Sequence, residues 1–119
     1  SKKGSEILRA AGVPEEICQA VLIHNPEHGI APVTTMDKAL LTGETYTGFL
    51  VACALVQPDK KIASVSVASA MKKFGSKSFA AGADREIMKQ VEPLLGMKVE
   101  EMMEICLREM QGISNEIGL

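Results

Sequence analysis

Glu44 is the residue whose setting most directly suggests chemistry. It is the only charged residue between Lys38 and Asp59, in a segment otherwise made of apolar, small and hydroxyl-bearing residues and one glutamine, Gln57. A segment this apolar is typical of a helix that is buried on most of its faces. An ionised carboxylate there costs on the order of several kcal/mol unless a cation, a metal or hydrogen-bond donors compensate it. The neighbouring threonines and Tyr46 fit a solvent-facing polar edge equally well, so both interpretations remain open.

His24 is the second residue that could take part in chemistry. It shares one helical face with Ile17 and Val21, a setting in which a packed core histidine is the ordinary alternative. Together with Glu44, however, it offers a ring nitrogen and a carboxylate oxygen on consecutive predicted helices, a ligand set for Zn, Mn, Fe or Mg-like ions. A hydrolytic centre needs more than two ligands. The sequence supplies no convincing third, because His28 lies in a loop rich in proline and glycine, where a solvated role is expected.

A group of basic residues flanks a stretch that contains glycine and serine. We predict that Lys73, Lys77 and Arg85 bind phosphate oxygens, since arginine can bind them in a bidentate manner and lysine as a point charge. The alternative is a charged, solvated helix end.

The elements that must position these residues are all helical. Hydrophobic spacing and breaker residues predict one domain over residues 1–119, with helices over about 3–11, 14–24, 35–57, 66–74, 85–95 and 99–112. No convincing β alternation occurs. We therefore predict an all-α bundle of about five to six helices.

Local signals set several of these boundaries. Gly12 is expected to end the first helix, Thr34 and Asp37 resemble a capping box, and Asp84 is a good N-cap. The uncharged run of the long helix predicts that both Leu50 and Leu55 are buried. The final helix is expected to pack through a stripe that includes Met102, Met103 and Met110.

Composition excludes several classes of protein. The formal net charge is −2, which argues against a nucleic-acid-binding surface. The apolar run over residues 49–56 is too short to span a membrane. Cys18, Cys53 and Cys106 form no CxxC pair, so we expect neither a zinc site nor a disulfide framework, but reduced, buried thiols in a cytoplasmic protein.

Several short sequence motifs, in their order and spacing, resemble those of the HD-domain metal-dependent phosphohydrolases. The resemblance is specifically to the compact bacterial and archaeal subgroup with an HDIG-type helical core. The resemblance covers nearly the whole chain, and its motifs are GSEIL, GVPEEI, AVLIHN, MDKAL, TGFLVA, KKF and KSFAAGADRE. In that family a histidine, a later His-Asp doublet and a downstream aspartate bind the metal. The resemblance implies an HD-domain-like fold that lacks the segment carrying the first three of these ligands.

The resemblance also implies roles for the two candidate ligands. Glu44 stands where relatives carry the last acidic ligand, usually as aspartate, and His24 matches an additional histidine of two-metal members. The implied activity is hydrolysis of a phosphate ester or a nucleotide with a divalent metal ion as cofactor. The 119 residues alone are expected to be inactive. They are also expected to expose an apolar surface that favours homo-oligomers. The alternative function is a non-catalytic helical domain that binds or regulates a protein partner.

Overall fold

The computed structural model describes residues 2–119, and within that range all the secondary structure is helical, as predicted. The helices are α1 (Lys2–Ala10), α2 (Glu15–Ile23), α3 (Thr35–Leu55), α4 (Val67–Phe74), α5 (Arg85–Lys89), α6 (Val91–Leu95), α7 (Val99–Gly112) and α8 (Ser114–Ile117), with two 3-10 turns, η1 (Pro26–His28) and η2 (Ile62–Ser64). None of the helices described in this range combines the length and the apolarity needed to cross a bilayer.

The helix expected over residues 85–95 consists of two short helices that meet at Gln90. Pro93 accounts for the break. Proline has no N–H to donate to the carbonyl of Lys89 four residues earlier, and its ring clashes with that carbonyl in a continuous helix. This break and the short α8 give the described chain more helices than the sequence predicted.

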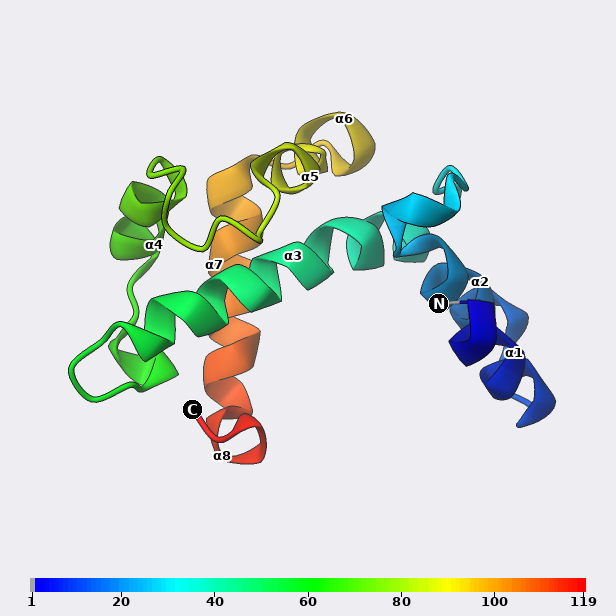
Figure 1. Ribbon diagram of the computed structural model, residues 1–119, viewed down its shortest axis with the longest axis horizontal. Coiled ribbons are helices and arrows are strands. Elements are labelled where there is room, and N and C mark those ends of the chain that lie inside the picture. The colour runs from blue at the N-terminus through cyan, green and yellow to red at the C-terminus, as the bar shows by residue number, and fades with distance from the viewer. Residues whose placement is uncertain (1) are drawn as a thin grey trace.

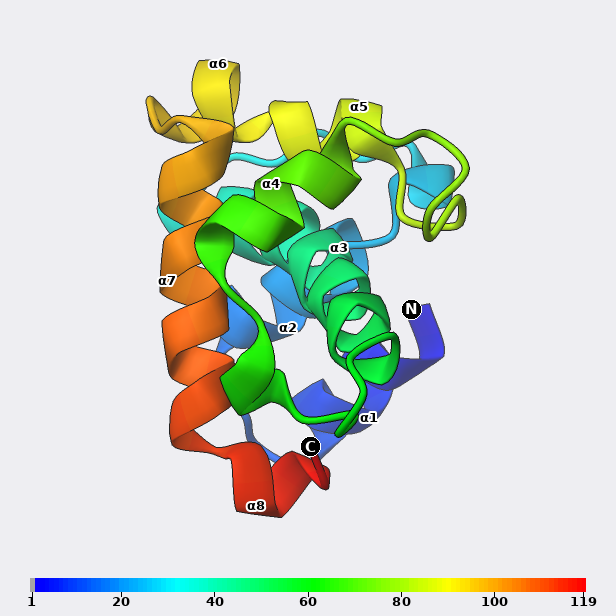
Figure 2. The ribbon, with the colours of Figure 1, turned by 90° about the vertical axis from the view of Figure 1, so that its left-hand side faces the viewer.

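Helix α3 is the axis of the molecule (Figure 1). The α1–α2 hairpin packs at its N-terminal end, whereas α4, α5, α6 and α7 surround its remaining length. Figure 2 shows α4 and α7 on the end of the molecule that lies away from the hairpin. Helix α7 passes close to Gly43, where a Cβ atom would lie 3.2 Å from the terminal methyl of Met102 and would require that methyl to shift slightly.

The main core is built on one face of α3. Tyr46, Phe49, Leu50 and Cys53 follow helical spacing and are fully buried. They pack against Val91 and Met103 among others, and Met102 and Met110 are buried as predicted. The prediction that Leu55 is buried is wrong, because that side chain is 51% exposed. It lies two residues beyond Cys53, which turns it about 200° away from the buried face.

The predicted helix caps are present. Thr34 Oγ1 accepts a hydrogen bond from the amide of Asp37 at 3.0 Å, and Asp37 Oδ2 accepts one from the amide of Thr34 at 2.9 Å. Asp84 caps α5 by accepting from the amide of Glu86 at 2.8 Å. Gly12 follows α1 with a φ of 80°, a conformation that favours glycine. These caps fix where α3 and α5 begin, and therefore where Glu44 and Arg85 lie.

Candidate functional site

Glu44 is exposed on α3, so the solvent-facing interpretation of its setting is the one observed. The residue lines a hollow of about 320 Å3, together with Thr45, Gly48, Ala80, Gly82 and Ala83. Within residues 2–119 its carboxylate has no ion-pair or hydrogen-bond partner. An accessible carboxylate therefore faces the connection between α4 and α5 without any burial cost to compensate.

His24 caps the C-terminus of α2 and is half-buried. Its Nδ1 lies 2.5 Å from the carbonyl oxygen of Val21, and Nδ1 of His28 lies 2.8 Å from the carbonyl oxygen of Leu22. A carbonyl can only accept, so Nδ1 carries the proton in both rings. In the neutral ring Nε2 is then the nitrogen with the lone pair, which is how metal-binding histidines are commonly oriented.

The two predicted metal ligands do not form a complete metal site within residues 2–119. His24 is not among the residues that line the Glu44 hollow. Across residues 2–119, no three side chains of His, Cys, Asp or Glu come together in a way that could hold a metal ion. Ligation by His24 and Glu44 stays a prediction.

Arg85 is the most extensively hydrogen-bonded side chain near this hollow. Its guanidinium donates to six backbone carbonyls at 2.5–3.5 Å, those of Lys73, Phe74, Ser76, Phe79, Ala80 and Ala83. It also lies over two aromatic rings, 4.8 Å from the centre of Phe49 and 5.7 Å from that of Phe74. A phosphate that bound directly to Arg85 would have to displace these carbonyls.

The two predicted lysines differ in their surroundings. Lys73 is half-buried, and its Nζ donates to Ser69 Oγ at 3.0 Å on the same helix. Lys77 is exposed and lines a second hollow of about 620 Å3, which Arg85 and Lys89 also line. Sequence reasoning missed Lys89, because it lies on α5, twelve residues after Lys77 in the chain, and nothing local to it predicts that the two share a hollow.

A third hollow, of about 370 Å3, lies between α2 and α3 and is apolar. It is lined by Ile17, Ala20, Val21, Met36, Ala39 and Leu40. Ile17, expected on a core face, is 39% exposed there. The spacing of Ile17 and Val21 was visible in the sequence. The exposure of this face among the described residues could not be predicted from the sequence.

The cysteines are poor candidates for nucleophiles. Burial raises the pKa of the Cys53 thiol, and the positive charges of Lys73 and Arg85 offset this only in part. Burial also raises the pKa of Cys106. A thiolate is the reactive form of cysteine, so both residues are held in the unreactive form near neutral pH.

Comparison with known protein families, curated proteins and solved structures finds no match to this chain. The resemblance to HD-domain phosphohydrolases therefore rests on the short sequence motifs alone.

Proposed function

We propose that this domain is part of an HD-type, divalent-metal-dependent phosphohydrolase that acts on a phosphate ester or a nucleotide. The observation that carries the proposal is the carboxylate of Glu44, which is accessible and unpaired within residues 2–119. It lines a hollow whose opposite wall is the connection between α4 and α5. An accessible carboxylate beside a loop that bears Lys77 and leads into Arg85 is suited to a metal that contacts a phosphoryl group.

The orientation of His24 supports the same function. Its Nδ1 is engaged by the carbonyl of Val21, which fixes the ring and leaves Nε2 as the ligating nitrogen. One carboxylate and one imidazole suit a divalent metal in chemical type, but they are too few to hold one firmly. The remaining ligands must come from elsewhere in the protein. When bound, the metal would supply an activated water and polarise a phosphoryl oxygen.

The test uses the natural gene product, including any residues encoded before Ser1. The protein is loaded with Mn²⁺ and, separately, Zn²⁺, and its metal content and its hydrolysis of phosphomonoesters and nucleotides are measured. Glu44→Gln keeps the size of the side chain and removes its charge. Glu104→Gln, on the exposed side of α7, is the matched control.

We expect Glu44→Gln to lose bound metal and turnover together, by about tenfold or more, because loss of one ligand weakens both. The control should change neither. An unmodified protein without metal-dependent hydrolysis would overturn the proposal, and so would a Glu44→Gln variant that keeps both its metal and its turnover.

The apolar hollow between α2 and α3 favours a second candidate function, a non-catalytic helical domain that binds a protein partner. For that function we propose a second copy of the chain as the occupant, since exposed Ile17 and Met36 together offer an apolar surface of the kind that oligomers cover. Metal-dependent turnover distinguishes the two functions. For both functions we propose a cytoplasmic location, in keeping with three free cysteines.

A further inference from the structure

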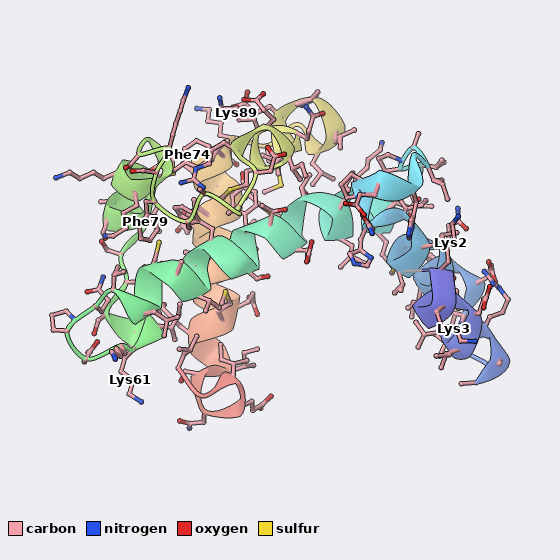
Figure 3. The ribbon with its side chains drawn as sticks, viewed as in Figure 1. Lys2, Lys3, Lys61, Phe74, Phe79 and Lys89 are labelled. Atoms are coloured by element: carbon pink, nitrogen blue, oxygen red, sulfur yellow. The ribbon has the colours of Figure 1, made fainter. Side chains whose placement is uncertain are left out.

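The connection between α4 and α5 turns its carbonyl groups inward, toward Arg85. Those of Ser76, Phe79 and Ala80 all accept hydrogen bonds from the guanidinium, at 3.1, 2.5 and 3.1 Å. Figure 3 shows Phe74 and Phe79 at the α4 end of the molecule, beside this connection. Phe49 packs edge-on against both rings, with ring centres 6.4 and 5.7 Å apart, so the connection and Arg85 are held together.

The direction of these carbonyls fixes the direction of the adjacent amides. In a planar trans peptide, the N–H of each residue points opposite to the C=O of the residue before it. The N–H groups of Lys77, Ala80 and Ala81 therefore point away from Arg85, on the outer side of the connection. None of these three amides has a hydrogen-bond acceptor within residues 2–119. Ala80 has a φ of 46°, and this left-handed turn lets two successive carbonyls reach the same cation, so that the two amides after them share a side.

The charges around this outer surface favour an anion. Arg85 forms no ion pair among the described residues, so only carbonyl dipoles compensate its positive charge. Lys77 and Lys89 line the same hollow, and so do Asp84 and Glu86. Asp84 is engaged with the amide of Glu86, and Glu86 pairs with Lys89 at 3.4 Å. The hollow is therefore lined by three positive and two negative side chains, which leaves a net positive charge.

We propose that the outer side of this connection is an oxyanion-binding surface, where the amides of Lys77, Ala80 and Ala81 and the ammonium of Lys77 bind the phosphoryl group of a ligand. Successive N–H groups at a left-handed residue, as those of Ala80 and Ala81 are, form a recurrent anion-binding arrangement, and a lysine adds a charge-assisted contact. Arg85 is then a positioning residue. It orients the amides through its bonds to the carbonyls that precede them, and because those carbonyls occupy its guanidinium it does not bind the anion directly. The choice of a phosphoryl ligand rests on the proposed function, but binding here needs no metal.

The test is a titration of the isotope-labelled chain with pyrophosphate, followed by NMR of the backbone amides and of the Arg85 Nε–H. EDTA removes metal, and KCl holds the ionic strength constant. The titration runs to about 20 mM, which covers weak, millimolar binding. Failure of this titration would leave the metal test of Glu44 unaffected, so the two proposals fail separately.

We expect saturable shifts of the amides of Lys77, Ala80 and Ala81, with little change at Arg85 Nε–H. Shifts at Arg85 as large as those of the amides would overturn the proposal, since they indicate direct binding by the guanidinium. The absence of any saturable shift in the three amides would also overturn it.

Two variants provide a matched comparison. Lys77→Gln should weaken pyrophosphate binding about two- to fivefold, the range expected for one exposed charge. Lys72→Gln removes an exposed lysine that does not line the hollow, and it should leave the affinity unchanged. Equal effects of the two substitutions would mean that only the general charge of the protein attracts the anion, and would overturn the site.

Discussion

The hydroxyl of Tyr46 donates a hydrogen bond to the carbonyl of Met88 at 2.8 Å, and both residues are fully buried. The bond joins the middle of α3 to α5, forty-two residues further along the chain. It therefore fixes α5, which carries Arg85, against the helix that carries Glu44.

Replacing Tyr46 by Phe should destabilise the protein by about 1–3 kcal/mol, because the Met88 carbonyl loses its donor in a site that water does not reach. Urea unfolding at neutral pH measures this difference, and an unchanged slope with denaturant would show that the compactness of the two states is unaltered. A loss below about 0.5 kcal/mol would mean that the carbonyl finds another partner.

Tyr46 should also make the protein sensitive to alkali. Burial, followed by the proximity of Cys106 and Glu92, raises the pKa of its phenol far above the ordinary value of about 10. The phenol ionises more readily in the unfolded chain, so its contribution to stability is complete below about pH 10 and is lost as the pH rises further. The free energy of unfolding should thus fall more steeply above pH 10 in the natural protein than in Tyr46→Phe. Parallel curves for the two proteins would contradict this, since Cys53 and Cys106 titrate in both.

Leu50 and Leu55 should respond very differently to truncation. Leu50→Ala deletes a fully buried side chain and should cost about 2–5 kcal/mol. Leu55→Ala alters a half-exposed position and should cost less than about 1 kcal/mol. Thermal melts of the two variants, measured side by side, provide the comparison. Equal losses would place Leu55 in the core after all.

Removing the guanidinium of Arg85 should release the connection between α4 and α5. Arg85→Gln cannot satisfy the carbonyls that the natural side chain bonds, and it should cost at least about 2 kcal/mol. We also expect faster cleavage by trypsin after Lys77, which lies on this connection. Arg108→Gln, at an exposed position of α7, is the control. Unchanged cleavage at Lys77 would show that the connection keeps its path without Arg85.

Self-association should depend on the apolar hollow between α2 and α3. Ile17→Gln adds a polar group within the hollow and should reduce concentration-dependent association in sedimentation experiments. Ile7→Gln changes a more exposed isoleucine outside it, 59% exposed on α1, and should have little effect. A protein that stays monomeric at all concentrations, or an equal effect of both substitutions, would rule out this surface.

The elements that the sequence predicts well are those set by neighbours in the chain. Thr34 and Asp37 form their capping box within a single turn, so the start of α3 could be read from four residues. The spacing of apolar residues likewise predicted the helical fold. The exposure of Glu44 could not be predicted, because an apolar helix does not reveal which of its faces neighbouring elements cover.

The surroundings of Arg85 were also beyond sequence reasoning. Its six acceptors are backbone carbonyls, which every residue possesses, and their convergence depends on the path of residues 73–83. The sequence could therefore not show that a hydrogen-bonded loop surrounds Arg85, and phosphate binding by Lys73, Lys77 and Arg85 stays a prediction. The metal-binding roles of His24 and Glu44 remain predictions, since they depend on ligands that the described residues do not supply.

The α1–α2 hairpin lies at one end of α3, and its buried residues Cys18, Ala20 and Ile23 do not belong to the main core cluster. Such a unit is expected to open at a lower free energy than the rest of the fold, and its amide protons should exchange sooner. His24 would move with the hairpin when it opens, whereas Glu44 would stay with the main core. A metal ion that bound both residues would therefore join two cooperative units, and slower exchange in α1 and α2 would report its binding.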